Sequence, residues 1–281
     1  MQQSTTKIVV GKNRWLFSRR WSPDQSPIGM VLIVHGLGEH SGRYANVARC
    51  LVEAGFGVAA VDLPGHGKSP GKRGYIADYD VLLQDLDKLR AQLDADLPQF
   101  VYGHSLGGNL VLNYALRWQP DVMGFVVTSP LVLPATVPPL WKRQVARLLN
   151  AVWPSFTFQT RVRPADLSHD LDAIRAQQED PLVHNHVSAR LALQMFQAGR
   201  YARAHAAKLA RPMLLLHGSS DQITSHQASR EFAEQAGPIC ELRINSGGFH
   251  ELHWEADRAE TLAGVVDWLK MHCVSDAPSR H

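Results

Sequence analysis

One short stretch of this 281-residue chain restricts the fold more than any other. Residues 100–108 read Phe-Val-Tyr-Gly-His-Ser-Leu-Gly-Gly, an apolar run that breaks into Gly-x-Ser-x-Gly. A buried strand that ends in such a turn and restarts as a helix holds its serine on a sharp elbow, with the hydroxyl exposed above the sheet. Gly103 and Gly107 leave space for the tight backbone. Ser105 is therefore the candidate nucleophile, and residues 109–116 fit the helix that should follow it.

The rest of the chain alternates apolar runs with amphipathic stretches, which predicts an α/β fold with a mostly parallel sheet and covering helices. Six apolar runs fit buried strands, at 30–34, 57–61, 100–102, 125–128, 213–216 and 240–244. Helical spacing of apolar residues occurs between these runs, at 44–54, 79–93, 225–235 and 257–272. The polar tail 275–281 is expected to be frayed.

The alternation stops between residues 131 and 209, where several prolines occur and no clear buried strand is found. We expect a helical cap at 131–209, inserted into an α/β core formed by 1–130 and 210–281. Within the cap, helical spacing occurs at 140–153 and 189–205.

The first cap helix has one apolar face, which includes Leu149 and Trp153. Packing of this face on the core is the simpler interpretation, because amphipathic helices usually bury their apolar side internally. The alternative is that Leu149 and Trp153 line an acyl-binding site or that the face contacts a membrane.

Composition excludes several classes of protein. Hydrophobic residues make up 45% of the chain, and the net charge of +3 comes from scattered basic residues, which does not suggest nucleic-acid binding. Cys50, Cys240 and Cys273 are far apart and odd in number, as expected of free thiols in a reducing compartment. No signal peptide and no apolar run of membrane-spanning length is found, so we expect a cytoplasmic protein that can still touch lipid surfaces.

A serine nucleophile needs a base, and the base needs an orienting acid. In an elbow fold the chain order is serine, acid, histidine, each after a strand. Asp221 follows the run 213–216 and is the candidate acid, although it could instead cap the helix at 225–235. His250, in the glycine-rich loop after 240–244, is the candidate base.

Two other histidine sites stand out in the sequence. His253 lies three residues after His250 and competes with it as base, but we expect it on a helical turn. The pair His184 and His186 has no matching Cys, Asp or Glu cluster, so no metal site is expected there.

An oxyanion formed during attack needs two backbone N–H donors. Leu106 directly follows the nucleophile and supplies one candidate. Leu37, in the loop His-Gly-Leu-Gly at 35–38, supplies the other, since glycines let a backbone approach a substrate closely.

Several blocks together resemble the monoacylglycerol lipase group of the α/β-hydrolases. They are His-Gly-Leu-Gly-Glu-His-Ser-Gly-Arg-Tyr at 35–44, Asp-Leu-Pro-Gly-His-Gly-Lys-Ser at 62–69, the elbow, Asp-Pro-Leu at 180–182, His-Gly-Ser-Ser-Asp at 217–221 and Gly-Gly-Phe-His-Glu at 247–251. The first block is far more specific than the elbow. The similarity runs from about residue 15 to 268.

The resemblance implies an eight-stranded α/β-hydrolase core with a mobile helical cap over an acyl-binding tunnel. It also implies a Ser105–His250–Asp221 triad with Leu37 and Leu106 as oxyanion donors. By the same resemblance Glu39, Arg43 and His253 form a polar cluster beside the triad, although Glu39 and Arg43 at i, i+4 could simply stabilise a helix start.

These observations favour a serine ester hydrolase acting on single-chain acyl esters, most directly monoacylglycerols, with no metal or organic cofactor. A lysophospholipase, a general carboxylesterase and an acyltransferase would share the catalytic residues. A ligand-binding receptor on a hydrolase scaffold is the alternative of another class. The sequence of the cap does not choose among them, because fold and triad are common to all.

Overall fold

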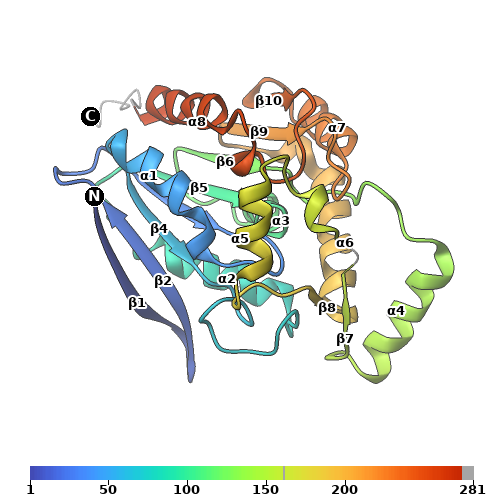
Figure 1. The fold of residues 1–281 in the computed structure, drawn as a ribbon. Helices are drawn as coiled ribbons and strands as arrows, with labels where there is room; N and C mark the ends of the chain where they lie inside the picture. Colours follow the sequence, from blue (N-terminus) through green and yellow to red (C-terminus); the bar gives the residue numbers. More distant parts are fainter. Residues whose placement is uncertain (161, 274–281) are drawn as a thin grey trace.

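The computed structural model describes residues 1–160 and 162–273, and the tail predicted to be frayed lies outside this range. Its centre is an eight-stranded sheet in the order β1-β2-β4-β3-β5-β6-β9-β10 (Figure 1). The strands are β1 (Gln2–Gly11), β2 (Arg14–Ser22), β3 (Met30–Val34), β4 (Gly57–Val61), β5 (Gln99–His104), β6 (Gly124–Thr128), β9 (Met213–Gly218) and β10 (Cys240–Asn245).

The six strands predicted from apolar runs are confirmed, and they pair in parallel from β4 to β10. Strands β3, β4, β5, β6 and β9 are buried almost throughout, which is why they read as nearly continuous apolar runs, whereas the edge strand β10 is mostly half-buried. Because the strands are parallel, their carboxyl ends meet at one edge of the sheet. The loops that carry Leu37, Ser105, Asp221 and His250 all leave the sheet at that edge.

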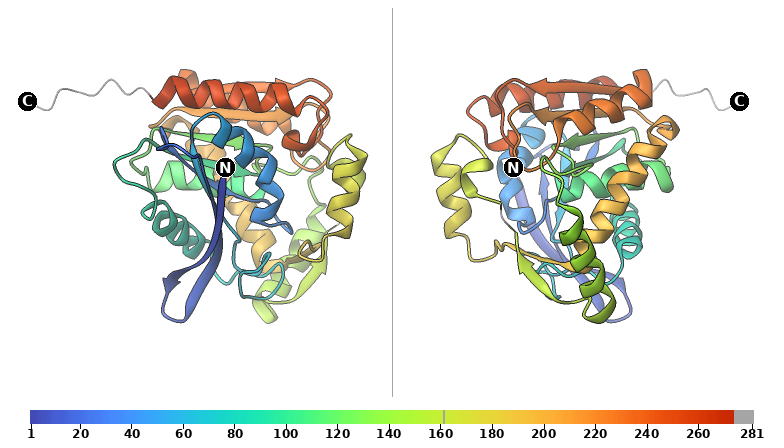
Figure 2. Two further views of the ribbon diagram at one scale, coloured as in Figure 1. Left: turned by 60° about the vertical axis from the view of Figure 1, so that its left-hand side comes forward. Right: turned by 90° about the vertical axis from the view of Figure 1, so that its right-hand side faces the viewer.

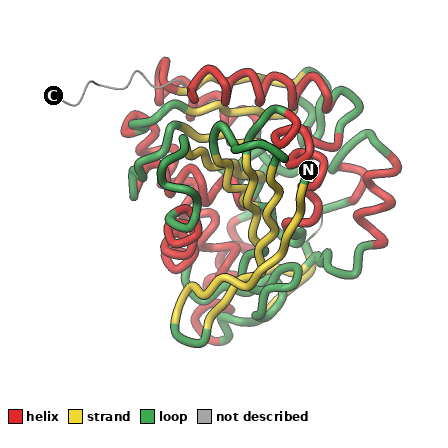
Figure 3. Tube along the Cα trace, turned by 90° about the vertical axis from the view of Figure 1, so that its left-hand side faces the viewer, coloured by secondary structure: helices red, strands yellow, loops and turns green. Residues whose placement is uncertain are grey.

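The β1–β2 hairpin is the part of the sheet that the apolar runs did not reveal. β2 is antiparallel to both β1 and β4, and residues Gln2–Lys7 of β1 are exposed. An antiparallel ribbon of this kind needs little apolar surface, so its sequence looks like an ordinary polar segment. Figure 3 shows the hairpin extending from the edge of the twisted sheet.

Helices cover both faces of the sheet, as predicted (Figure 2). Val31 and Ile33 of β3 pack in one core with α1 (Ala45–Glu53) and α8 (Arg258–Cys273). Leu32 and Val34 point to the other core. That core contains residues of α2 (Tyr79–Arg90), α3 (Leu106–Arg117), α6 (Ala189–His205) and α7 (His226–Ala236). The three cysteines are free.

The segment between β6 and β9 contains more structure than the sequence predicted. The expected helices are present as α4 (Leu140–Val152) and α6. A third helix, α5 (Leu171–Glu179), and the paired strands β7 (Thr157–Gln159) and β8 (His186–Ser188) are too short to give a clear periodicity. Figure 1 shows α4 outside the two helical layers, and the left-hand view of Figure 2 shows α5 outside them.

Helix α6 packs directly on α3. The side-chain amides of Asn109 and Asn113 in α3 donate to the carbonyls of Met195 and Ala198, at 3.3 and 3.1 Å. The division into an α/β core, residues 1–130 and 210–281, and a helical cap, residues 131–209, remains a proposal, in which α6 is the part of the cap segment that packs on α3.

The expectation that the apolar face of α4 packs on the core is wrong. Leu140, Leu148 and Val152 are 71%, 65% and 77% exposed, and α4 has no buried residue. The helix turns its polar side towards α6 instead. Among the described residues, no helix is both long enough and apolar enough to cross a membrane.

Candidate active site

Ser105 lies on the sharp turn that its motif predicts. Its backbone has φ 53° and ψ −111°, a strained conformation for a residue with a side chain, and α3 begins at the next residue. The amide of Ser105 donates to Thr128 O at 3.0 Å, and its carbonyl accepts from Leu131 N at 3.1 Å. A Cβ on Gly107 would lie 2.0 Å from the carbonyl oxygen of Val34, so only glycine lets α3 approach β3 this closely.

Asp221 and His250 are paired as the sequence predicted. The Nδ1–H of His250 donates to Oδ2 of Asp221 at 2.7 Å, and both side chains are buried. Asp221 does not cap α7, because Ser225 occupies that position and accepts from Ala228 N. The alternative role that the sequence left open for Asp221 is therefore not observed.

Further donors fix the carboxylate of Asp221. Its Oδ1 accepts from the amides of Ile223 and Thr224 at 2.7 and 3.0 Å. Its Oδ2 accepts from the Thr224 hydroxyl at 2.8 Å and from His217 Nε2 at 3.1 Å. His217 and Thr224 were not singled out from the sequence, although both lie within four residues of Asp221.

Asp221 and His250 shift each other's pKa in opposite directions. Burial alone would raise the pKa of Asp221, but His250 and His217 hold it well below its usual range. Burial alone would lower the pKa of His250, yet the Asp221 carboxylate raises it above the ordinary value. An ionised aspartate that stabilises a protonated imidazole is the arrangement that a general base requires.

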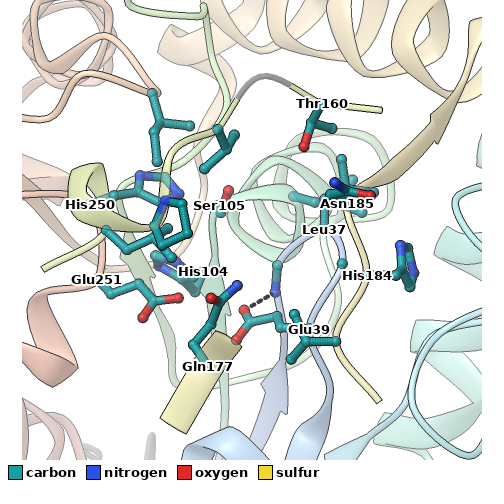
Figure 4. Close-up of a pocket in the computed structure, with 18 of the residues that line it drawn as sticks. Leu37, Glu39, His104, Ser105, Thr160, Gln177, His184, Asn185, His250 and Glu251 are labelled. Carbon is teal, nitrogen blue, oxygen red and sulfur yellow. Dashed lines mark hydrogen bonds between the residues drawn. The ribbon is translucent and has the colours of Figure 1, made fainter. Parts of the chain in front are cut away.

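Ser105 and His250 both line a cavity of about 510 Å³ at the carboxyl edge of the sheet. In Figure 4, Ser105 lies between His250 on one side and Leu37 on the other. His104, the residue before the serine, places its ring 4.8 Å from that of His250 and is also part of the lining. Burial keeps the pKa of His104 well below its usual value, so this neighbour stays neutral.

Leu37 and Leu106 also line this cavity. Leu106 is the first residue of α3, where backbone N–H groups have no partner within the helix and the helix dipole favours negative charge. A hydrogen bond within the loop that carries Leu37 fixes its conformation: Gly36 N donates to Oε1 of Glu39 at 2.5 Å (dashed in Figure 4).

The next residue of this loop contacts the segment before β8. The amide of His184 donates to Gly38 O at 2.8 Å. Gly38 has φ 82°, and a Cβ there would lie 2.1 Å from the carbonyl oxygen of His184. A residue other than glycine would be strained at this position and would also collide with its neighbour.

The predicted polar cluster exists, but its members differ from those expected. Arg43 donates to Glu39 at 3.3 Å and to Glu251 at 2.6 Å, and all three side chains are buried. The Glu39–Arg43 pair does not lie within one helix, because Glu39 precedes the 3-10 helix η1 (Ser41–Tyr44). It connects the loop of Leu37 to the loop of His250.

His253 packs beside this cluster without bonding to it. Its ring stacks on Tyr44 with centroids 4.9 Å apart, and neither ring nitrogen has a hydrogen-bond partner among the described residues. It lies in the 3-10 helix η5 (Leu252–Trp254), as the expected helical turn implied. Glu251, which the cluster uses, directly follows His250 and could have been found from that position.

The cavity wall differs from the predicted acyl site. Leu149 and Trp153 are not among its lining residues. Instead α5 contributes Gln177 and Gln178, and Gln177 points towards the carboxylates of Glu39 and Glu251 in Figure 4. The apolar part of the lining consists mainly of Leu106, Leu131, Val162, Pro164, Leu167, Val183, Met195 and Ile223.

His184 and His186 lie on the rim of the same cavity, with ring centroids 6.0 Å apart. Within residues 1–160 and 162–273 no group of three or more His, Cys, Asp or Glu side chains is arranged to hold a metal ion.

The sheet order, the elbow and the cavity define an α/β-hydrolase. The sequence profile of the serine aminopeptidase S33 family matches residues 25–257. A monoacylglycerol lipase of Mycolicibacterium smegmatis is 32% identical over 258 residues, which cover 90% of this chain and 91% of that protein. An abhydrolase domain-containing protein of Dictyostelium discoideum is 34% identical over 96% of this chain, but the match spans 29% of that longer protein.

A solved structure is equally similar. The crystal structure of a monoacylglycerol lipase from Paleococcus ferrophilus has a TM-score of 0.85 and 35% identity, over 92% of this chain and 99% of that one. The chain belongs to the monoacylglycerol lipase group of the α/β-hydrolases, and it is a carboxylic ester hydrolase.

Proposed function

We propose that the protein hydrolyses monoacylglycerols to fatty acid and glycerol with Ser105, His250 and Asp221 as catalytic triad. His250 takes the proton of the Ser105 hydroxyl as that oxygen attacks the ester carbonyl. Asp221 fixes the tautomer of His250 and stabilises its protonated form, while the amides of Leu37 and Leu106 bind the oxyanion.

The reaction then proceeds through an acyl-enzyme. Collapse of the tetrahedral intermediate breaks the ester bond, and the glycerol oxygen leaves with the proton from His250. Water, deprotonated by the same histidine, attacks the acyl group on Ser105 and releases the fatty acid. No step needs a metal or an organic cofactor.

The charge of the cavity wall is the observation that favours a substrate with a neutral head group. The described lining contains three carboxylates, Glu39, Asp180 and Glu251, and one guanidinium, Arg43. Arg43 is already engaged by two of the carboxylates. Burial, the largest cause, lowers the pKa of His184 to about 4, so it adds no positive charge at neutral pH. Such a wall suits a polyol and repels a phosphate.

The size of the cavity and the named relatives support the same substrate. About 510 Å³ lies within the range of small-molecule sites, roughly 300–1,000 Å³. The relatives from M. smegmatis and P. ferrophilus are monoacylglycerol lipases.

The test measures glycerol release from a long-chain monoacylglycerol, beside a lysophospholipid and a short soluble ester, with Ser105→Ala as the blank. We expect preference for the monoacylglycerol and loss of all turnover in the blank. Faster turnover of the lysophospholipid would contradict the head-group argument and assign a lysophospholipase. Turnover of the short ester alone would mean that the protein is a general carboxylesterase. Near-normal activity of Ser105→Ala would refute the assignment of the catalytic triad.

Contact with the lipid surface through the cap belongs to the same proposal. The outer face of α4 and Trp153, the residue that follows the helix, expose six large apolar side chains: Leu140, Trp141, Val145, Leu148, Val152 and Trp153. Large exposed apolar side chains gathered along one helix are typical of an interaction site. Replacing Trp153 by glutamate should lower turnover of monoacylglycerol in vesicles about tenfold or more, since burying such a side chain contributes roughly 1.5–3 kcal/mol.

Turnover of a short soluble ester is the control for this variant and should not change. Equal losses on the two substrates would mean that α4 supports the fold rather than the lipid contact.

A further inference from the structure

Helix α4 has its polar side turned inward, which is the reverse of an ordinary surface helix. Lys142, Arg143, Ala146, Arg147 and Asn150 follow the i, i+1, i+4, i+5, i+8 spacing of one helix face. They line a second cavity of about 750 Å³, separate from the cavity of Ser105. Residues of α6 form the opposite wall.

Positive charge is concentrated in this cavity. Its lining contains Lys142, Arg143, Arg147, Arg190 and Arg200, which we call the basic groove, and one carboxylate, Asp78. Five cations against one anion give the groove a net charge of +4, whereas the whole chain carries +3. The excess is therefore local and is not a property of the surface as a whole.

These cations lack carboxylate partners in the part of the chain that the structure describes, where every ion pair uses other cations. Arg190 donates to neutral oxygens, Asn150 Oδ1 at 3.1 Å and Ala77 O at 3.3 Å. Asp78 is occupied as the N-cap of α2, where it accepts from Asp80 N. Several guanidinium groups that line one cavity without a paired carboxylate favour binding of a phosphate.

The surroundings of the basic groove favour a lipid as the source of that phosphate. Phe158, Leu193 and Phe196 add apolar surface inside the cavity. The outer face of the same helix exposes Leu148 and Val152, so apolar and basic surfaces lie on opposite sides of α4. A nucleic acid would gain nothing from the apolar face, whereas an anionic membrane lipid offers both an acyl region and a phosphate.

We propose that the basic groove between α4 and α6 binds the phosphate head group of an anionic membrane lipid. The acyl region of the bilayer then receives the exposed face of α4. The two cavities thus have opposite charge and separate tasks, because the basic groove anchors a lipid that is not hydrolysed and the negative cavity of Ser105 takes the neutral ester. The choice of ligand rests on the proposed lipid-surface contact, but the site is separate from the catalytic residues.

The test is co-sedimentation of the full chain with vesicles of phosphatidylcholine, with and without phosphatidylglycerol. The groove variant is Arg143→Gln with Arg200→Gln. The matched control is Arg49→Gln with Arg230→Gln, which removes two exposed arginines of α1 and α7 and so changes the net charge equally. Turnover of a short soluble ester is followed in all variants.

Phosphatidylglycerol should raise binding of the unmodified chain, and the groove variant should lose about twenty-five-fold in partition, roughly fivefold per arginine, while the control loses little. Ester turnover should stay unchanged, which separates a failure here from a failure of the proposed reaction. Equal losses in the two variants would mean general charge attraction, and equal binding to both vesicle types would leave only the apolar face. Either outcome overturns the inference.

Two competitors complete the test. If inorganic phosphate at millimolar concentration binds to the basic groove and vesicle binding is unaffected, the site takes free phosphate and not a lipid. If a single-stranded oligonucleotide binds and the groove variant abolishes that binding, the site belongs to nucleic acid. Both results would refute the proposal as stated.

Discussion

Arg43 is the buried cation that joins the loop of Leu37 to the loop of His250, through Glu39 and Glu251. It is 8% exposed and lies between Glu39 and Glu251, which are 6% and 5% exposed. Arg43→Met would keep most of the side-chain volume and leave two carboxylates facing each other without a cation. One of them, Glu39, also holds the loop of Leu37 by accepting from Gly36.

The expected cost follows from breaking a buried ion pair on one side only, which destabilises a fold by roughly 3–5 kcal/mol. Burial and the neighbouring Glu39 outweigh Arg43 and already raise the pKa of Glu251, so this carboxyl can take up a proton and relieve part of the cost. We therefore expect the free energy of unfolding to fall by about 3 kcal/mol at pH 8, at the low end of that range.

Glu251→Gln is the matched control, because it keeps Arg43 paired with Glu39 and removes one of two like charges. It should cost about 1 kcal/mol, the value of one hydrogen bond weakened rather than lost. The assay is denaturant unfolding of both variants, with turnover of a short ester beside it. Arg43→Met should also lower that turnover, because Glu39 no longer has a fixed position.

The stability loss of Arg43→Met should also depend on pH. Without Arg43 the folded-state pKa values of the two carboxyls rise above their unfolded values, so the folded state binds more protons. The deficit of Arg43→Met should therefore shrink as the pH falls from 8 to 5. A loss below about 1 kcal/mol, or the same loss in both variants, would mean that the cluster is hydrated and would refute this account.

Three shorter predictions concern the loops around the Ser105 cavity. His250→Ala should lower kcat/KM for a short ester by a factor on the order of 10³ or more, whereas His253→Ala should keep most activity; the reverse ranking would identify the wrong base. Asp221→Asn should move the acid limb of the kcat/KM profile to lower pH, because the carboxylate that raises the pKa of His250 is gone, and an unmoved limb would contradict this. Gly38→Ala should lower both thermal stability and ester turnover more than Gly247→Ala, which has a similar φ of 78° but no atom within 4 Å of the added Cβ; equal effects would leave only backbone strain.

The central strands below the site could be predicted, because a strand that is buried on both faces consists of a continuous run of apolar residues. The β1–β2 hairpin could not, since β1 is largely exposed and its pairing requires only backbone hydrogen bonds. The short helix α5 was also missed. Its nine residues carry one buried side chain, Ala173, which is too little for a periodic signal.

The pairing of His250 with Asp221 followed from chain order, because both loops leave neighbouring parallel strands at the same edge. The role of Glu251 was harder to predict. It depends on a contact with Arg43 across 208 positions of the chain, for which the sequence has no local mark. The prediction that the apolar face of α4 packs on the core failed for a general reason. An apolar stripe predicts that something covers it, but it does not say whether protein or lipid does so.

The hydrogen bond from His184 to Gly38 makes the proposed cap and the loop of Leu37 a single unit for protein engineering. Insertions and deletions should be tolerated around the exposed helix α4, where few backbone contacts would be lost. The segment before β8 has no such freedom, since its backbone abuts the loop of Leu37. A cap transplanted from a relative would therefore carry its substrate preference over only if the residues equivalent to 180–188 came from this chain.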